Sequence, residues 1–263
     1  KIPTDILSGL NIANIIPLNG EKQIENNTFV FRGNLQDSVD EILLITGALS
    51  QNSRMIKGLL NNIKNININH YFRMDHIRWN TEPLNIKYSK LKMIVLDDFP
   101  IHSQDSQLFQ KIVSMSKEKD IPIFYIQGPK CNLTAGEMIH SAYPYFVPKT
   151  EVPDLLMDIS TQSTWFKTYD IDLDKFPPQK RSIKWIPSKI PWLSYMDESV
   201  LIGNYNSFYL ISMPALTESH FKISINSNSI IAQILKKVFF HAFHGSTGLL
   251  SLELDGKLFN KGE

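Results

Sequence analysis

The sequence predicts an α/β fold in which helices cover both faces of a mainly parallel sheet, so that the domain has three layers. Short apolar runs alternate along the chain with segments whose apolar residues repeat at helical spacing. The clearest of these runs end in turn-forming residues such as Gly, Asp and Pro. Strands that alternate with helices imply right-handed βαβ crossovers, and these place the strands parallel.

The first predicted strand covers residues 41–47, a nearly continuous apolar run that ends in Gly, as expected of a strand covered on both faces. A helix follows, capped by Ser50 or Ser53, with apolar residues at positions i, i+3, i+4 and i+7. These are Ile56, Leu59, Leu60 and Ile63. Residues 66–74 then alternate between apolar and polar side chains, which predicts a strand near an edge of the sheet.

The second core strand is predicted at residues 91–97, and Asp97-Asp98 at its end indicates a sharp exit into a loop. Ser103 or Asp105 can open the next helix. Its inner side is predicted to carry Leu108, Phe109, Ile112, Val113 and Met115. Residues 121–126 form another apolar strand, followed by the turn signal Gly128-Pro129.

The pattern loosens at about residues 135–191, where prolines recur, and this segment is predicted to be irregular or to carry only short helices. Six aromatic residues lie in or beside it and are expected to anchor it or to contact another module. They are Trp165, Phe166, Tyr169, Trp185, Trp192 and Tyr195. A β-hairpin is predicted at residues 199–203 and 207–212, and a last helix at about 227–243.

Both ends of the chain carry short alternating stretches of β type, at residues 26–31, 250–254 and 256–263. We therefore expect a flanking β-type segment at residues 1–39, an α/β domain at 40–248, and the start of a following β-module at 249–263. Because the chain begins at Lys1 without Met or a signal-like segment, we expect a processed chain or an excised fragment.

Composition excludes several classes of protein. The 27 basic and 26 acidic residues leave a formal charge of +1, and no long basic run follows a phosphate backbone, so nucleic acid is not an expected partner. No apolar stretch is long enough to span a bilayer. The single cysteine, Cys131, allows no internal disulfide and fits a reducing or an oxidising compartment equally. No motif indicates a cofactor.

The order of the elements over about residues 40–245 resembles the class I glutamine amidotransferase-like superfamily, which implies a flavodoxin-like sandwich. In active relatives, a strand that begins with Pro leads into a turn that presents a nucleophilic Cys between two glycines. The run from Pro122 places Gln127 at the nucleophile position and Pro129 at the second glycine. A later strand of the family ends in His-Pro-Glu, whereas here Met213 and Ala215 flank the retained Pro214. The resemblance therefore implies that the nucleophile, the base and its orienting carboxylate are all lost.

A more specific similarity is to the non-catalytic domains of this superfamily found in large bacterial envelope proteins, between immunoglobulin-like β-modules and beside von Willebrand factor A domains. The residues that carry it are Glu25-Asn26-Asn27, Leu43-Leu44-Ile45, Asp97-Asp98 and Gly128-Pro129. It implies a non-enzymatic structural or interaction module, whose partners are neighbouring β-modules or other envelope proteins. It also implies a location on the extracytoplasmic side of the cell envelope.

Two alternatives remain open. In the first, Cys131 acts as a nucleophile with His220 and Glu218 in a hydrolase or amidotransferase, although Cys131 lies four residues past the expected turn. In the second, Asp97, Asp98, Gly128 and Pro129 bind a small ligand or a divalent cation at the carboxyl edge of the sheet. The structural alternative to that site is that Asp98 caps a turn while Asp97 hydrogen-bonds amides of the loops.

Overall fold

A computed structural model describes residues 9–14, 28–33, 40–63, 66–75, 77–81, 90–150, 156–160, 178–217 and 233–239. The chain divides into two compact units, Lys1–Val39 and Asp40–Glu263. In the first unit, β1 (Gly9–Asn14) pairs antiparallel with β2 (Thr28–Gly33). The predicted β-type stretch at residues 26–31 overlaps β2, and the stretches at 250–254 and 256–263 lie outside the described residues.

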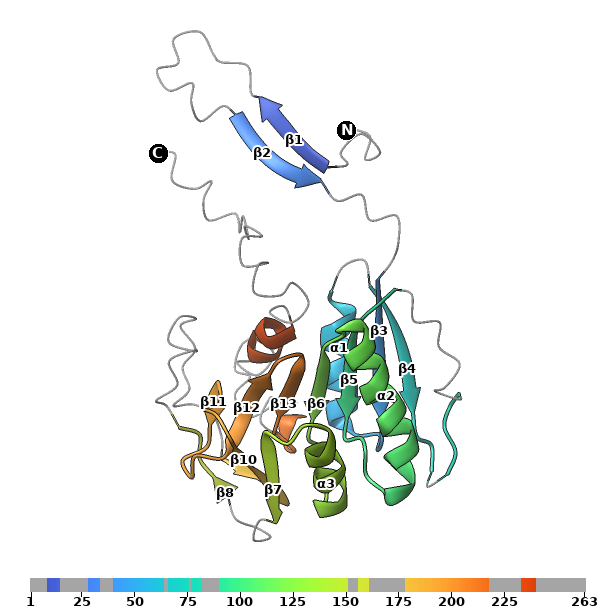
Figure 1. Cartoon of the computed structure of the whole chain (residues 1–263), viewed down its shortest axis with the longest axis vertical. Helices are drawn as coiled ribbons and strands as arrows, with labels where there is room; N and C mark the ends of the chain where they lie inside the picture. The colour runs from blue at the N-terminus through green and yellow to red at the C-terminus, as the bar shows by residue number, and fades with distance from the viewer. Residues whose placement is uncertain are drawn as a thin grey trace. The chain divides into compact units, whose positions relative to one another are not determined.

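The second unit is built on a seven-stranded sheet in the order β11-β12-β13-β6-β5-β3-β4 (Figure 1). Its strands are β3 (Asp40–Thr46), β4 (Ile66–Phe72), β5 (Leu91–Asp97), β6 (Ile123–Ile126), β11 (Leu193–Ser194), β12 (Val200–Tyr205) and β13 (Phe208–Ile211). The strands from β13 to β4 are parallel, whereas β12 and β11 add antiparallel at one end. The prediction of an α/β sandwich with a mainly parallel sheet and a late hairpin is confirmed.

Individual strands follow their sequence patterns. The side chains of β5 are buried except at Lys92, as expected of a strand in the middle of the sheet. The alternating β4 is the edge strand, and most of its side chains are only half-buried. In the hairpin, Asn206 has φ 53°, a left-handed conformation that Asn tolerates better than most residues.

The helices form the two outer layers. Ser50 caps α1 (Gln51–Asn61), and Asp105 is the N-cap residue of α2 (Ser106–Lys119). Asn132 caps α3 (Leu133–Ala142) through a hydrogen bond from Ala135. Within the predicted last helix, the described residues 233–239 are helical. Figure 1 shows α2 and α3 on the opposite side of the sheet from α1.

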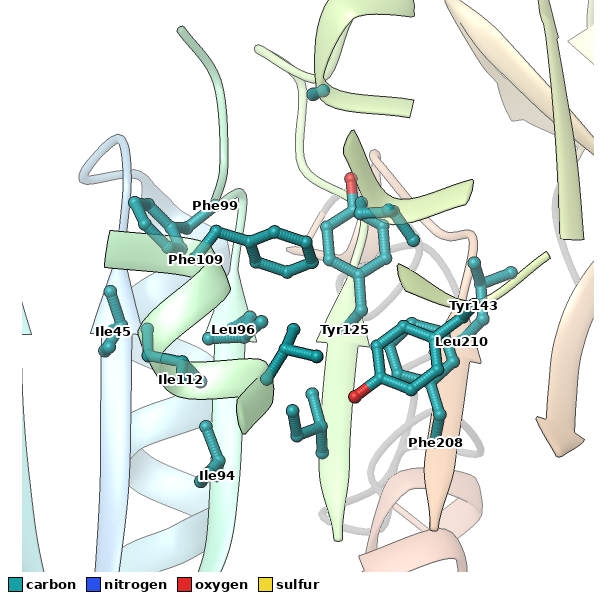
Figure 2. Packing of buried hydrophobic residues seen from close by; sticks show 14 of the residues in the cluster. Ile45, Ile94, Leu96, Phe99, Phe109, Ile112, Tyr125, Tyr143, Phe208 and Leu210 are labelled. Atoms are coloured by element: carbon teal, nitrogen blue, oxygen red, sulfur yellow. The ribbon is translucent and has the colours of Figure 1, made fainter. Parts of the chain in front are cut away.

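Two apolar cores correspond to the two faces of the sheet. Met93 and Val95 of β5 pack with α1 and with Ile234 and Leu235 of the last helix. Ile94 and Leu96 pack in the other core with residues from α2 and α3. Figure 2 shows part of this second core, where side chains of α2 point toward β5 and toward Tyr125 of β6. Successive strand residues thus bury alternate faces, which is the pattern of a sheet covered on both sides.

The prediction of an irregular segment at about 135–191 is corrected in part. The segment begins within α3, and β7 (Phe146–Thr150) pairs antiparallel with β10 (Ile183–Pro187). A shorter pair joins β8 (Leu156–Met157) to β9 (Gln179–Lys180). The prolines suggested irregular structure, but Pro148 and Pro187 lie in a two-stranded sheet, where both strands are edges and tolerate a missing N–H group. Residues 151–155 and 161–177, which include three of the six aromatic residues, lie outside the described part.

Across the described ranges, no helix combines the length and apolar character that a membrane span requires.

Candidate functional site

The candidate site lies at the carboxyl edge of the central sheet, where the parallel strands β3, β5, β6 and β13 all end. Open α/β sheets bind their ligands at this edge. Five polar side chains at or just beyond these strand ends are buried. They are Thr46, Asp97, Asp98, Gln127 and Ser212. The edge therefore has a polar interior, and the partners of these groups decide what chemistry it can support.

Gln127, the residue aligned with the family nucleophile, is fully buried and hydrogen-bonded through both ends of its amide. Its Oε1 accepts hydrogen bonds from Trp185 Nε1 at 2.9 Å and from Ser212 Oγ at 2.7 Å. Its Nε2 donates to the carbonyl oxygen of Ile183 at 3.1 Å. The side chain thus joins β6 to β13 and to β10 of the following segment.

Trp185 covers this position from the second apolar core. Its side chain is completely buried and meets the Tyr125 ring edge-to-face, with the ring centroids 5.9 Å apart. A β-carbon on Gly136 of α3 would lie 2.6 Å from Pro148, the cross-strand partner of Trp185. Of the described aromatic residues noted in the sequence, Trp185 reaches the carboxyl edge through Gln127, and Tyr195 reaches it by donating to the main-chain oxygen of Ser212.

The loop after β13 offers no catalytic base at the positions the family uses. Met213 is completely buried, and Ala215 is half-buried. Asn52 of α1 holds this loop by donating to the carbonyl oxygen of Pro214 at 2.9 Å and by accepting from the main chain and the hydroxyl of Thr217. The thioether of Met213 and the methyl group of Ala215 cannot act as the base or the orienting carboxylate of a catalytic triad.

Asp97 lies at the end of a hydrogen-bonded chain that begins on β4. The Thr46 hydroxyl donates to Asp97 Oδ2 at 3.1 Å, and His70 Nε2 lies 3.0 Å from the same hydroxyl oxygen. Because the single hydroxyl proton of Thr46 is used on Asp97, His70 donates from Nε2. Burial, with the positive charge of Lys57, lowers the pKa of His70 to about 4, so that its ring is neutral near pH 7.

The carboxyl group of Asp97 is among the most strongly perturbed at this edge. Burial raises its pKa to about 7, the neighbouring charge of Asp98 adds to the rise, and the hydroxyls of Ser53 and Thr46 oppose it. Its second oxygen, Oδ1, is buried and accepts no hydrogen bond within the described structure.

Asp98 adopts a left-handed conformation with φ 47° and turns into the loop that follows β6. Its Oδ2 accepts the main-chain N–H of Lys130 at 2.9 Å. Burial raises the pKa of Asp98 to about 6, whereas hydrogen bonds from the main chain of Lys130, Cys131 and Gly128 and the charge of Lys130 lower it. Its Oδ1 is also buried without a donor among the described residues. The structural alternative expected loop amides to bond to Asp97, but the loop amide of Lys130 bonds to Asp98, and Asp97 accepts from the hydroxyl of Thr46 instead.

Two glycines allow the chain to pack closely around Asp98. A β-carbon on Gly47, after β3, would lie 2.1 Å from the main-chain oxygen of Asp98. A β-carbon on Gly128, after β6, would lie 2.4 Å from Cγ of the same residue. Gly128 is buried, and the next residue, Pro129, is exposed. The chain therefore closes over Asp98 from both neighbouring strands.

The two aspartates do not make a convergent metal site in the described structure. By strand alternation, Asp97 lies on the face of Met93 and Val95, and it bonds to Thr46, whereas Asp98 bonds to the loop after β6. No group of three or more His, Cys, Asp and Glu side chains suitable for a metal ion occurs among the residues that are described.

Cys131 is a buried thiol that contacts the Tyr125 hydroxyl and, at 3.9 Å, the main-chain oxygen of Asn132. The Tyr125 hydroxyl donates to its Sγ at 3.0 Å, and only 3% of the residue is exposed. Burial raises the pKa of the thiol to about 12, the hydrogen bond from Tyr125 opposes this rise, and the charge of Asp98 adds to it. A thiol in this state carries almost no thiolate at neutral pH. His220 and Glu218, its predicted partners, lie outside the described residues.

A separate buried ion pair, not predicted from the sequence, braces the loops beyond β4 and β5. Arg73 Nη2 bonds to Asp105 Oδ1, and Asp105 Oδ2 accepts the main-chain N–H groups of Ile101 and His102 at 2.8 and 2.9 Å. The Arg73 guanidinium also lies 4.9 Å from the ring centre of Trp79. Arg73 and Trp79 stand in a mixed polar and aromatic stretch that carries no periodic signal, so the sequence gives no indication of their pairing.

Comparison with known proteins gives little further identification. No protein-family model matches the chain, and no curated protein matches it. One similar solved structure is a beta-galactosidase from the psychrophilic Marinomonas ef1, with 9% identity and a TM-score of 0.38. The alignment covers 78% of this chain but only 29% of that enzyme. Another is described as a component of GMP synthase from Thermoplasma acidophilum, with 9% identity and a TM-score of 0.36, covering 76% of this chain and 98% of the other. Similarities at these TM-scores carry no argument about activity.

Proposed function

We propose that this chain is a non-catalytic structural or protein-interaction module of a larger protein, built on a degenerate amidotransferase-like fold. The observation that carries the proposal is the state of Gln127. At the position where the family presents a nucleophile, the chain has a fully buried amide hydrogen-bonded to three other residues. A residue used in this way is unavailable to a substrate.

The properties of Cys131 support the same proposal. Catalytic cysteines are partly exposed and have a lowered pKa, because the thiolate is the nucleophile. Cys131 is buried, and its pKa is raised to about 12. Its nearest polar group is a tyrosine hydroxyl that donates to the sulfur, and that group is not a base.

The activity part of the proposal can be tested with glutamine and with an electrophilic glutamine analogue that alkylates active-site thiols. The purified chain and its Cys131→Ser variant are incubated with each, and ammonia release and intact mass are measured. We expect no ammonia above the level of the variant and no adduct on the native protein. The same analogue should alkylate Cys131 after denaturation in urea, which confirms that the reagent is active.

Saturable alkylation of native Cys131, together with ammonia release that C131S abolishes, would instead establish the hydrolase alternative. In that case the proposal of a non-catalytic module would be abandoned.

The larger protein that we propose is an envelope protein, and the partners are its neighbouring β-modules or other envelope proteins. This part rests on the family resemblance of residues such as Asp97-Asp98 and Gly128-Pro129. Fractionation of source cells, followed by immunoblotting with an antibody against this chain, tests it. We expect the signal in the envelope fraction and its loss when intact cells stripped of their outer layers are treated with protease. A signal confined to the cytosol contradicts this location.

A further inference from the structure

The carboxyl edge of the sheet contains two adjacent acidic residues whose charges are poorly compensated. Asp97 and Asp98 are 0% and 1% exposed, and Oδ1 of each has no hydrogen-bond donor in the described structure. The hydroxyls of Thr46 and Ser53 stabilise the charged form of Asp97, and main-chain N–H groups stabilise that of Asp98. The salt bridges of the described residues include neither aspartate.

The surroundings supply few charges that could stabilise two carboxylates. On the side of Asp97, β3 contributes Thr46, β4 contributes neutral His70, and α1 contributes Ser53, with Lys57 near His70. On the side of Asp98, the loop after β6 brings its main chain, the exposed Lys130 and the thiol of Cys131, and β6 contributes Tyr125. Among the described residues, Lys130 is therefore the cation that acts directly on the pair, and it acts from the surface.

Physical chemistry favours a neutral form in such a place. A buried carboxylate oxygen without a donor loses its hydration without compensation, and a group in that position takes up a proton instead. Two adjacent carboxyls raise the cost further, because like charges disfavour each other's ionisation. A proton on Oδ1 removes the charge of the carboxyl, so the burial of an oxygen without a donor no longer carries the cost of burying an ion.

The closure of the loops depends on the same carboxyl groups. Gly47 and Gly128 bring the main chain of both neighbouring strands against Asp98, and the N–H groups of residues 128, 130 and 131 bond to its side chain. Outward movement of this loop would admit water to Asp98, beside Asp97, and would also expose the thiol of Cys131, which is a buried residue of the loop itself.

We propose that Asp97 and Asp98 form a proton-operated latch, in which at least one carboxyl holds a proton while the carboxyl edge is closed. Release of that proton to water leaves two uncompensated carboxylates, and the loop at residues 128–132 then opens more readily. The loop therefore opens less often in mild acid than in mild alkali.

The direction of this pH dependence follows from the linkage between protonation and stability. The pKa of Asp97 is raised from 3.8 to about 7 and that of Asp98 to about 6 in the folded protein. A carboxyl whose folded pKa is raised stabilises the closed form fully below its unfolded pKa, and this contribution is lost as pH rises through the folded value. The window of the latch is therefore about pH 4 to 7. His70, with a pKa lowered to about 4, acts in the opposite sense, because its contribution is lost as pH falls below about 6.5.

Alkylation of Cys131 measures the opening of the loop directly. The labelling rate of the native chain is divided, at each pH, by the rate of the urea-unfolded chain, which removes the intrinsic pH dependence of the thiol. The same measurement is made on Asp97→Asn and Asp98→Asn, which stay neutral at every pH. We expect the ratio of the wild-type rate to either variant rate to rise about tenfold or more from pH 5 to pH 8. Taking this ratio cancels the opposing effect of His70.

Asp120→Asn is the matched control. Asp120 is exposed at the end of α2 and has φ 50°, close to the 47° of Asp98, so the substitution makes the same chemical change in the same backbone conformation. The ratio of wild-type to D120N rates should stay constant with pH. A constant ratio for both D97N and D98N would overturn the latch.

Two further measurements keep the proposal testable if a variant does not fold. Infrared difference spectra of the wild-type chain between pH 6 and pH 8 should show the carbonyl band of a protonated carboxyl, and absence of that band would overturn the proposal. Millimolar Mg²⁺ or Ca²⁺ should leave the labelling rate unchanged at pH 8. If either ion slows labelling of the wild type but not of D97N, a cation and not a proton occupies the unpaired oxygens.

Discussion

At the scale of a single residue, Gln127 is a buried polar side chain that connects several segments of the fold. Its three hydrogen bonds reach Trp185 and Ile183 in β10 and Ser212 after β13, so the side chain connects segments far apart in sequence. Buried polar groups that satisfy one another in this way stabilise a fold, but each depends on the presence of the others.

Replacement of Gln127 by Ala is therefore expected to destabilise the chain by about 2 to 4 kcal/mol, because the buried indole N–H and the Ile183 carbonyl lose their partner. Urea unfolding followed by tryptophan fluorescence measures this loss. Gln110→Ala, at an exposed position of α2, is the control and should change stability by less than about 0.5 kcal/mol. Equal effects of the two substitutions would show that the Gln127 network is not structural.

The sequence predicts part of the candidate site at this scale, but not the partners of its residues. Asp97 and Asp98 are predictable because they end an apolar strand, and a strand end marks the edge of a sheet. The contacts of Thr46, His70 and Ser212 are not, because the register of separate strands brings them to the edge and no local pattern encodes that register. The burial of Cys131 behind Tyr125 is likewise a tertiary property.

At the scale of elements, a glycine where a strand meets a loop can be packed much more closely than a glycine on an exposed helix face. Gly47→Ala should cost about 2 to 3 kcal/mol or more, because its β-carbon would meet the main chain of Asp98 at 2.1 Å, and main chain cannot rotate away. Gly58→Ala, on the exposed face of α1 with nothing within 4 Å, should stabilise by about 0.5 to 1 kcal/mol. Thermal unfolding of both variants tests the contrast, and destabilisation by G58A or tolerance of G47A would contradict it.

The elements that the sequence predicted well are those with a strong period. The buried runs at β3, β5 and β6 and the amphipathic helices α1 and α2 were all recognised, and Ser50 was recognised as a possible cap. The pair β7–β10 was missed because its partners are separated by more than 30 residues and contain Pro148 and Pro187. Proline argues against a central strand, but it does not exclude the strands of a two-stranded sheet, because both of those are edges.

At the scale of the molecule, the α/β sandwich follows from the alternation of strands and helices, whereas the antiparallel addition of β12 and β11 depends on how the hairpin folds back. The two apolar cores on opposite faces of one sheet both lie in the unit Asp40–Glu263. A unit with its own core is expected to fold independently.

Accordingly, a chain of residues 40–263 should unfold in one cooperative transition at the same midpoint as the full chain. It should also keep the near-ultraviolet circular dichroism of buried aromatic residues such as Trp185 and Tyr125. Far-ultraviolet circular dichroism during thermal unfolding measures the midpoint, and near-ultraviolet circular dichroism measures the aromatic signal. A lower midpoint, or loss of the aromatic signal, would show that residues 1–39 contribute to the fold of the second unit.

The hydrogen bonds of Gln127 also limit which substitutions this chain can accept one at a time. A single change of Gln127 to Cys would place a thiol at this position, but it would leave the groups of Trp185, Ser212 and Ile183 unmatched in the interior. A tolerated exchange would need simultaneous changes in β6, β10 and the end of β13, each harmful alone. Variation among natural sequences at these four positions is therefore expected to be coupled, so that the residues are kept or replaced as a set.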